Sequence, residues 1–285
     1  MKQKSISPFW TWAGILLAGA ALIVFIAFTP PTLLRKLDYV GAAVCHRIPS
    51  HSFFVGGRQL PICQRCTGTF NGALLGLLFQ WIVLRRRKGQ RFPALWVWGL
   101  MALFFALWGL DGANSFLATG DVQLDVLGVT IRALYEPQPW LRLLTGTLVG
   151  MSMSIALVAA FNETMWADGV DERSLRGWRD LSPLLAVELA QAALIYLLEP
   201  WMLYPLAIYS ALSVLSLFVL LGAMVWVMAL GLDQTYTHWQ QIWLPLLWGL
   251  AFAALIIGGM DALRLFLTGT IDGMPTLVTR AGMLT

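Results

Sequence analysis

The sequence predicts an all-α fold, a polytopic bundle of about seven transmembrane helices. Of its 285 residues, 58% are hydrophobic and only 12% are charged, whereas a soluble domain usually contains about 25% charged residues. The 14 tryptophans fit the aromatic belts of a membrane-spanning bundle. The apolar segments are continuous and do not alternate apolar with polar residues. We therefore expect helices rather than the strands of a membrane barrel.

Seven apolar runs are each long enough to cross a hydrocarbon layer of about 30 Å. We expect the spans over residues 10–30, 66–84, 93–110, 142–161, 182–198, 203–231 and 242–267. The first run follows a basic N-terminus, as in a signal peptide. However, the uncharged stretch from Ser5 to Leu34 is too long for the apolar part of one, and no small-x-small cleavage site follows. We interpret it as a retained first span.

The connections between the spans differ in character. Residues 163–180 mix charges of both signs and are expected to form a solvated loop. The third span is expected to stop at Asp111, and residues 121–136 of the following connection fit either a short interfacial helix or an ordered loop. No repeat, proline-rich linker or low-complexity tract divides the chain. We expect one integral membrane domain over 1–285, with an extramembrane loop over 35–66.

The basic residues favour a cytoplasmic N-terminus. Lysine and arginine divide almost evenly between the two faces, but residues 85–91 form a basic cluster directly after the second span. The positive-inside rule is strongest at such positions. The loop over 35–66 would then lie on the outer face. No basic surface with interleaved aromatic residues is evident, so we expect the lipid bilayer as a partner and no nucleic acid.

All three cysteines, and two of the three histidines, lie between Val44 and Gly68. Cys63 and Cys66 form a C-x-x-C at the predicted start of the second span, where helix geometry brings residues three apart to the same side. The pair Cys45–His46 precedes them at a spacing seen between the two halves of zinc sites. We therefore predict a metal site formed by Cys45, His46, Cys63 and Cys66, with zinc favoured and iron possible.

The fourth ligand decides what such a metal can do. His51 or Asp111 is an alternative to His46. A closed set of four protein ligands makes a structural site, which we favour because enough candidate ligands are present. An open fourth position would make the ion a Lewis acid that acts on a lipid-like substrate. No catalytic residue or reaction follows from the sequence.

Two other classes of function use the same segment. Cys63 and Cys66, at a helix N-terminus on an oxidising face, are compatible with a membrane thiol–disulfide oxidoreductase that passes electrons to a quinone. The chain is also compatible with a non-catalytic subunit of a larger membrane complex. A plain disulfide with one buried thiol is the inert alternative.

Further polar residues are expected near the cysteines or inside the membrane. Asp111, Arg142, Asp261 and Arg264 are predicted on the same face as the cysteines and form a possible pocket for a lipid head group. Asp261 and Arg264 are three residues apart and are expected to pair along one helix. Glu188 lies inside the fifth span, where an ionisable residue indicates either function or interhelical hydrogen bonding. Gly68, Gly72 and Gly76 predict a closely packed second span.

The cysteine segment contains a Cys-His-x-x-Pro, then Ser-Phe-Phe, a glycine and Gln-x-Pro-x-Cys-x-Arg-Cys-x-Gly. The matching residues are Cys45, His46, Pro49, Ser52, Phe53, Gly57, Gln59, Pro61, Cys63, Arg65, Cys66 and Gly68. This pattern resembles the signature of a family of predicted prokaryotic membrane proteins, a domain of unknown function. The family is also similar at "LDGANSFL" (Asp111, Gly112) and "LRLLTGTLVG" (Arg142, Thr145, Gly146, Gly150). The resemblance covers about residues 40–155, with 115–140 interpreted as an insertion, and it implies no reaction.

Overall fold

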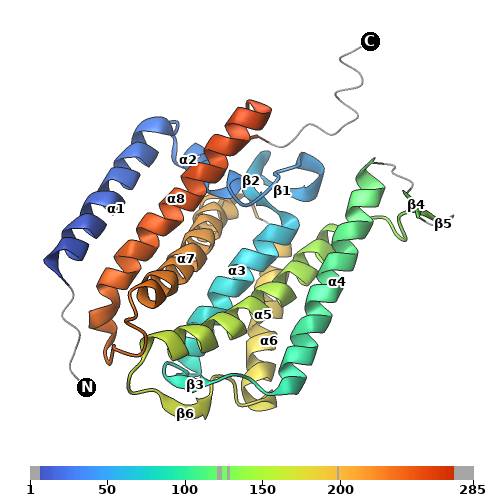
Figure 1. The fold of residues 1–285 in the computed structure, drawn as a ribbon. Helices are drawn as coiled ribbons and strands as arrows, with labels where there is room; N and C mark the ends of the chain where they lie inside the picture. The colour runs from blue at the N-terminus through green and yellow to red at the C-terminus, as the bar shows by residue number, and fades with distance from the viewer. Residues whose placement is uncertain (1–6, 121–123, 127–128, 198, 273–285) are drawn as a thin grey trace.

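The computed structural model describes residues 7–120, 124–126, 129–197 and 199–272. Within them, seven helices are long and apolar enough to span a membrane, as Figure 1 shows. In chain order these are α1 (Pro8–Phe28), α3 (Gln64–Leu78) together with its continuation η2 (Phe79–Val83), α4 (Leu95–Gly120), α5 (Pro139–Met165), α6 (Trp178–Leu197), α7 (Leu203–Ala229) and α8 (Trp243–Thr268). The predicted all-α transmembrane bundle and its seven spans are confirmed.

Shorter elements connect the spans. One end of the bundle carries the helix α2 (Leu33–Ala42), the turn η1 (Pro49–His51) and a hairpin of β1 (Ser52–Val55) and β2 (Arg58–Cys63). The opposite end carries β3 (Gly89–Arg91) and β6 (Val170–Arg173), which pair in parallel. The remaining elements are η2 (Phe79–Val83), which continues α3, and β4 (Leu124–Val126), β5 (Val129–Ile131), η3 (Pro200–Met202) and η4 (Trp239–Ile242).

The closest helix pair is α3 against α5, and glycines make the approach possible. A Cβ atom on Gly68 would lie 2.3 Å from the Leu143 carbonyl oxygen, and one on Gly146 would lie 2.2 Å from that of Arg65. Small residues allow such close backbone packing in lipid, where dispersion contacts replace the hydrophobic effect between helices. The predicted packing role of the glycines on the second span is therefore confirmed for Gly68.

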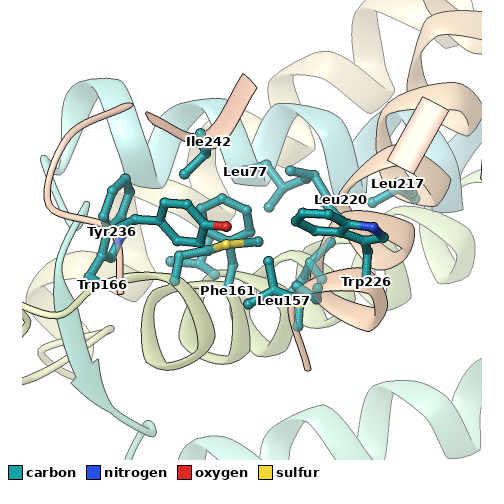
Figure 2. Packing of buried hydrophobic residues seen from close by; sticks show 14 of the residues in the cluster. Leu77, Leu157, Phe161, Trp166, Leu217, Leu220, Trp226, Tyr236 and Ile242 are labelled. Carbon is teal, nitrogen blue, oxygen red and sulfur yellow. The ribbon is translucent and has the colours of Figure 1, made fainter. Parts of the chain in front are cut away.

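The largest apolar core lies toward the end of the bundle opposite the cysteines. Figure 2 shows Leu77 from α3, Phe161 from α5 and Trp226 from α7 packed together, with Tyr236 from the following loop. Trp166 is fully buried in the same cluster. This core joins the central helices, whereas α1 packs at the edge of the bundle against α8.

The expected end of the third span is wrong, and of the two alternatives for its connection the helix does not form in the described residues. The helix does not stop at Asp111 but continues to Gly120, because Asp111 is paired with Arg65 of α3 and its charge is not left in an apolar layer. No interfacial helix forms over the described part of 121–136; there the strands β4 and β5 pair antiparallel. Residues 121–123 and 127–128 of that segment lie outside the described residues.

Candidate metal centre

The three cysteines meet at the end of the bundle that carries β1 and β2. The sulfur atoms of Cys45, Cys63 and Cys66 all lie within 4.8 Å of one another. A tetrahedral zinc ion with Zn–S bonds of about 2.3 Å holds its sulfurs about 3.8 Å apart, so this grouping is compatible with one shared ion. Cys45 and Cys63 are buried, Cys66 is half-buried, and all three are free thiols.

The local fold explains why residues distant in sequence converge. Gly56 and Gly57 both have positive φ angles, 57° and 77°, as the two-residue turn of a hairpin requires. The returning strand β2 ends at Cys63, which is also the N-cap of α3, so Cys66 lies in the first helical turn. The Cys63 backbone N–H then donates to the Cys45 sulfur at 3.1 Å.

Backbone amides surround the Cys45 sulfur. In addition to the Cys63 amide, the Arg47 N–H donates to this sulfur at 3.4 Å. Hydrogen bonds from N–H groups favour the charged form of an acceptor, and the charged thiolate is the form that ligates metals. These amides would thus stabilise the Cys45 thiolate once a bound cation displaces its proton.

The three thiols cannot all ionise independently at this spacing. The hydrogen bond with Cys63, followed by burial, raises the pKa of Cys45 to about 12. Hydrogen bonds with Cys45 and Cys66 instead lower the pKa of Cys63 well below its ordinary value. Ionisation of one thiol of the group therefore keeps its neighbour protonated, because two negative charges at short range repel each other. A bound cation removes this penalty.

His46, the predicted fourth ligand, is not part of the group of three sulfurs. Its Nε2 lies 3.3 Å from Nδ1 of His51, so the two imidazoles form a hydrogen-bonded pair. Burial lowers the pKa of His51 to about 4, which keeps this imidazole neutral near physiological pH. Asp111, the other alternative ligand, is bound to Arg65 instead.

A buried cluster of ion pairs fixes the loop that carries Cys45. Asp38 on α2 lies 2.8 Å from both Arg47 and Arg58, and 3.4 Å from Arg35. The side chains of Arg47 and Asp38 are each only 3% exposed. Arg47 also has a positive φ of 54°, a conformation that costs a non-glycine residue energy and persists where surrounding contacts hold it. The cluster ties this loop to both α2 and β2.

Arg264 on α8 binds backbone carbonyl groups of the same loop with its side chain. Its guanidinium donates to the carbonyl oxygens of Ala42 at 2.9 Å, Cys45 at 2.6 Å and His46 at 3.1 Å. The expected ion pair between Asp261 and Arg264 does not form among the described residues. The reason is that the three carbonyls at the end of α2 and in the cysteine loop bind the guanidinium instead.

A second polar network lies on the side of α4 and α5. Arg65, between the two cysteines of the C-x-x-C, pairs with Asp111 and donates to Ser115 at 3.1 Å. Arg142 donates to Ser115 at 3.3 Å and to the side chain of Gln64 at 3.3 Å. The hydroxyl of Tyr135 donates to Asp111 at 2.8 Å, and burial, ahead of this bond, raises the pKa of Tyr135 to about 12. This network braces the start of α3.

The four residues of the predicted polar pocket therefore fall into two groups. Asp111 and Arg142 belong to the network beside α4, whereas Asp261 and Arg264 lie on α8. A groove of about 310 Å³ runs between the cysteine loop and α8, and of these four residues Arg264 lines it. Its other walls include Cys45, His46 and apolar side chains of α8. Glu188 is fully buried midway along α6.

Sequence reasoning missed three features that position the cysteines. The hairpin has a visible signal, the Gly56–Gly57 dipeptide between two short apolar runs, which is a typical hairpin turn. Asp38 has a weaker one, a lone acidic residue among basic residues just before the cysteines. The contact of Arg264 with backbone carbonyls has no local signal, because its partners lie more than 200 residues away in the chain.

Comparison with known proteins agrees with this architecture. Residues 45–156 match the family described as "Predicted membrane protein (DUF2085)". An uncharacterised protein of Methanocaldococcus jannaschii is 23% identical over 127 residues, 45% of this chain and 69% of that protein. An uncharacterised protein of Methanothermobacter thermautotrophicus is 38% identical over 40 residues, 14% of this chain and 36% of that protein. No solved structure matches the chain. The predicted resemblance to an uncharacterised prokaryotic family of membrane proteins is thus confirmed over residues 45–156.

Proposed function

We propose that the three cysteines and His46 bind a structural metal ion, zinc first, which fixes the loop over residues 35–66 to the membrane-spanning bundle. The observation that carries this proposal is the approach of three sulfur atoms, from residues up to 21 positions apart, to within 4.8 Å of one another. Thiolate-rich tetrahedral sets suit zinc, and iron is the next choice.

The histidine pair supports His46 as the fourth ligand. A metal-ligating histidine usually donates its other ring N–H to a neighbouring acceptor, which fixes the tautomer and the ring orientation. His46 Nε2 already faces His51 Nδ1 at 3.3 Å. In this proposal Nδ1 of His46 binds the ion, Nε2–H donates to His51, and four protein ligands close the site.

Metal analysis of the detergent-purified protein tests the site. We expect about one zinc per chain, lost in the Cys63→Ser/Cys66→Ser double variant and in His46→Ala. His51→Ala should bind zinc roughly 10–100-fold more weakly, whereas the matched control His238→Ala, near the opposite end, should be unchanged. A wild-type protein without metal, or a His46→Ala variant with full metal content and affinity, contradicts the proposed ligand set.

The proposal also places the chain as one multi-pass domain in a prokaryotic plasma membrane, with the N-terminus cytoplasmic and the metal site on the outer face. The basic cluster over 85–91 lies at the same end of the bundle as the start of α1, opposite the cysteines, and basic residues favour the cytoplasmic side. Protease treatment of intact cells and of inverted vesicles tests this. A tag at the N-terminus should be cleaved only in the inverted vesicles.

The groove beside Cys45 favours a second candidate, a membrane thiol–disulfide oxidoreductase. Its volume of about 310 Å³ is at the lower end for small-molecule pockets, and its apolar walls suit a quinone. Cys63 and Cys66 would form a disulfide, and the two electrons and two protons released would reduce the quinone to a quinol. Thiol alkylation separates the candidates: a redox pair becomes alkylated only after reduction, whereas metal-bound thiols become alkylated when a chelator removes the ion.

A further inference from the structure

Glu188 is the most completely buried carboxyl group of the described residues, and neither of its oxygens has a hydrogen-bond partner there. The residue lies midway along α6 and is 0% exposed. Oε1 and Oε2 are both buried atoms without a donor within reach in the described structure. A carboxyl group in such a position inside a membrane bundle is costly and indicates a function.

The neighbours of Glu188 are packed around the carboxyl group and leave little space. A Cβ atom on Gly72 of α3 would lie 3.0 Å from Oε2, and one on Gly76 would lie 3.1 Å from Oε1. The same point beside Gly76 is 2.1 Å from the hydroxyl oxygen of Ser154 on α5. Glu188 therefore occupies the space where two glycines of α3 face α5 and α6.

Among the described residues, no positive charge faces this carboxyl group. The other charged side chains of α3, α5 and α6 stand at helix ends, namely Arg65, Arg142, Glu163, Arg179 and Asp180, and α7 has none. The titratable side chain nearby is Tyr209 of α7, whose hydroxyl donates to Gln191 at 2.8 Å and to the Asn71 carbonyl at 3.1 Å. An ionised Glu188 would thus be buried without a counter-ion or a hydrogen bond, which strongly favours the neutral acid.

Among the described residues of α3, its continuation and α6, unpartnered acceptor atoms outnumber unpartnered donors. In the described structure, Asn71 Oδ1 and Gln80 Oε1 on α3 and its continuation are also buried without a donor. Both residues are 0% exposed. The unpartnered donors on the described parts of these helices are Gln191 Nε2 on α6, Trp81 Nε1 on the continuation of α3 and Arg65 Nε at the start of α3. Polar groups buried in this way are nearly always satisfied in native proteins, so the region is short of hydrogen-bond donors. A proton on Glu188 supplies one.

We propose that Glu188, against Gly72 and Gly76 of α3, is a proton-binding site of the membrane-spanning core that exchanges its proton with water when α3 and α6 separate. The bound proton makes the carboxyl group neutral and gives it an O–H donor among the unpartnered acceptors. Release of the proton leaves a carboxylate that is stable only once water reaches it, so proton release is linked to opening of the helix pair. A proton requires no additional room, in agreement with the close packing at Gly76.

Infrared spectroscopy of the purified full chain in micelles tests this directly. Near neutral pH we expect a carbonyl band of a protonated carboxyl group that shifts in deuterated water. The band should be lost in Glu188→Gln and retained in the control Glu163→Gln, at an exposed position near the end of α5. A missing band, or one that does not shift after long incubation in deuterated water, overturns the proposal. A band that appears only when sodium is replaced by choline would assign the site to an alkali cation and also overturn it.

A second measurement needs no variant, in case Glu188→Gln does not fold. Dicyclohexylcarbodiimide modifies protonated carboxyl groups in apolar surroundings, and mass spectrometry of peptides locates the adduct. We expect modification at Glu188 and not at Glu163, decreasing as the pH rises. Modification of Glu188 that is absent, or that does not change with pH, contradicts an exchangeable proton.

Discussion

Ion pairs occur at both ends of the bundle, but most of those around the cysteines include a buried Asp38 or Asp111, whereas most of those at the opposite end are exposed. Arg47 and Asp38 are each 3% exposed, whereas Arg91 and Asp171, which pair beside β3 and β6, are 62% and 76% exposed. Buried charges must be paired or they are very costly, while exposed pairs contribute little. The contrast indicates that the charges at the cysteine end position the ligand loop.

The strongest way to break this contrast is Asp38→Asn. The substitution removes the carboxylate 2.8 Å from buried Arg47 and leaves it only the longer pair with Asp272 at 3.7 Å, so we expect a loss of about 3 kcal/mol in the free energy of unfolding. Unfolding in detergent, followed by circular dichroism, measures it. A loss below about 1 kcal/mol would mean that the buried cluster does not hold the loop.

Gly146→Ala tests whether the backbone contact of α5 with the start of α3 is equally necessary. The new methyl group would lie 2.2 Å from the Arg65 carbonyl oxygen, and we expect this overpacking to cost about 1–3 kcal/mol. The matched control is Gly109→Ala on α4, where no heavy atom lies within 4 Å. Equal melting temperatures for the two variants would contradict the close approach.

Arg264→Lys sharpens the contrast because it keeps the charge and changes the geometry. An ammonium group cannot reach the carbonyls of both Ala42 and His46 as the planar guanidinium does. We expect a loss of about 1 kcal/mol for each hydrogen bond not remade, and faster alkylation of Cys45 after metal removal. An alkylation rate equal to that of the wild type would show that Arg264 does not position this loop.

The smallest expected effect on stability is for a substitution at the end of the bundle that carries β3 and β6, where most ion pairs are exposed. Asp171→Asn removes a pair that is largely in water, so the free energy of unfolding should change by less than about 1 kcal/mol. The same unfolding assay applies. An effect as large as that of Asp38→Asn would remove the distinction between the two ends.

The sequence predicts the structural features that depend on a local pattern of residues. Hydropathy gives the seven spans, and the spacing of Cys63 and Cys66 places both at a helix start; the convergence of Cys45 with them is confirmed. It does not predict pairings between distant residues. The third span, α4, continues past Asp111 because Arg65, 46 positions away in the chain, neutralises the Asp111 carboxylate. Arg264 was expected to pair with Asp261, yet carbonyls far away in the chain bind it. Whether His46 binds a metal stays a prediction.

X-ray absorption spectroscopy at the zinc edge of the purified protein tests the central claim most directly, because it detects the atoms bound to the ion. We predict three sulfur neighbours at about 2.3 Å and one nitrogen at about 2.0–2.1 Å. The zinc signal itself should be lost in His46→Ala and in Cys63→Ser/Cys66→Ser, which do not retain the ion. A first shell of oxygen and nitrogen alone would contradict a metal site at these cysteines.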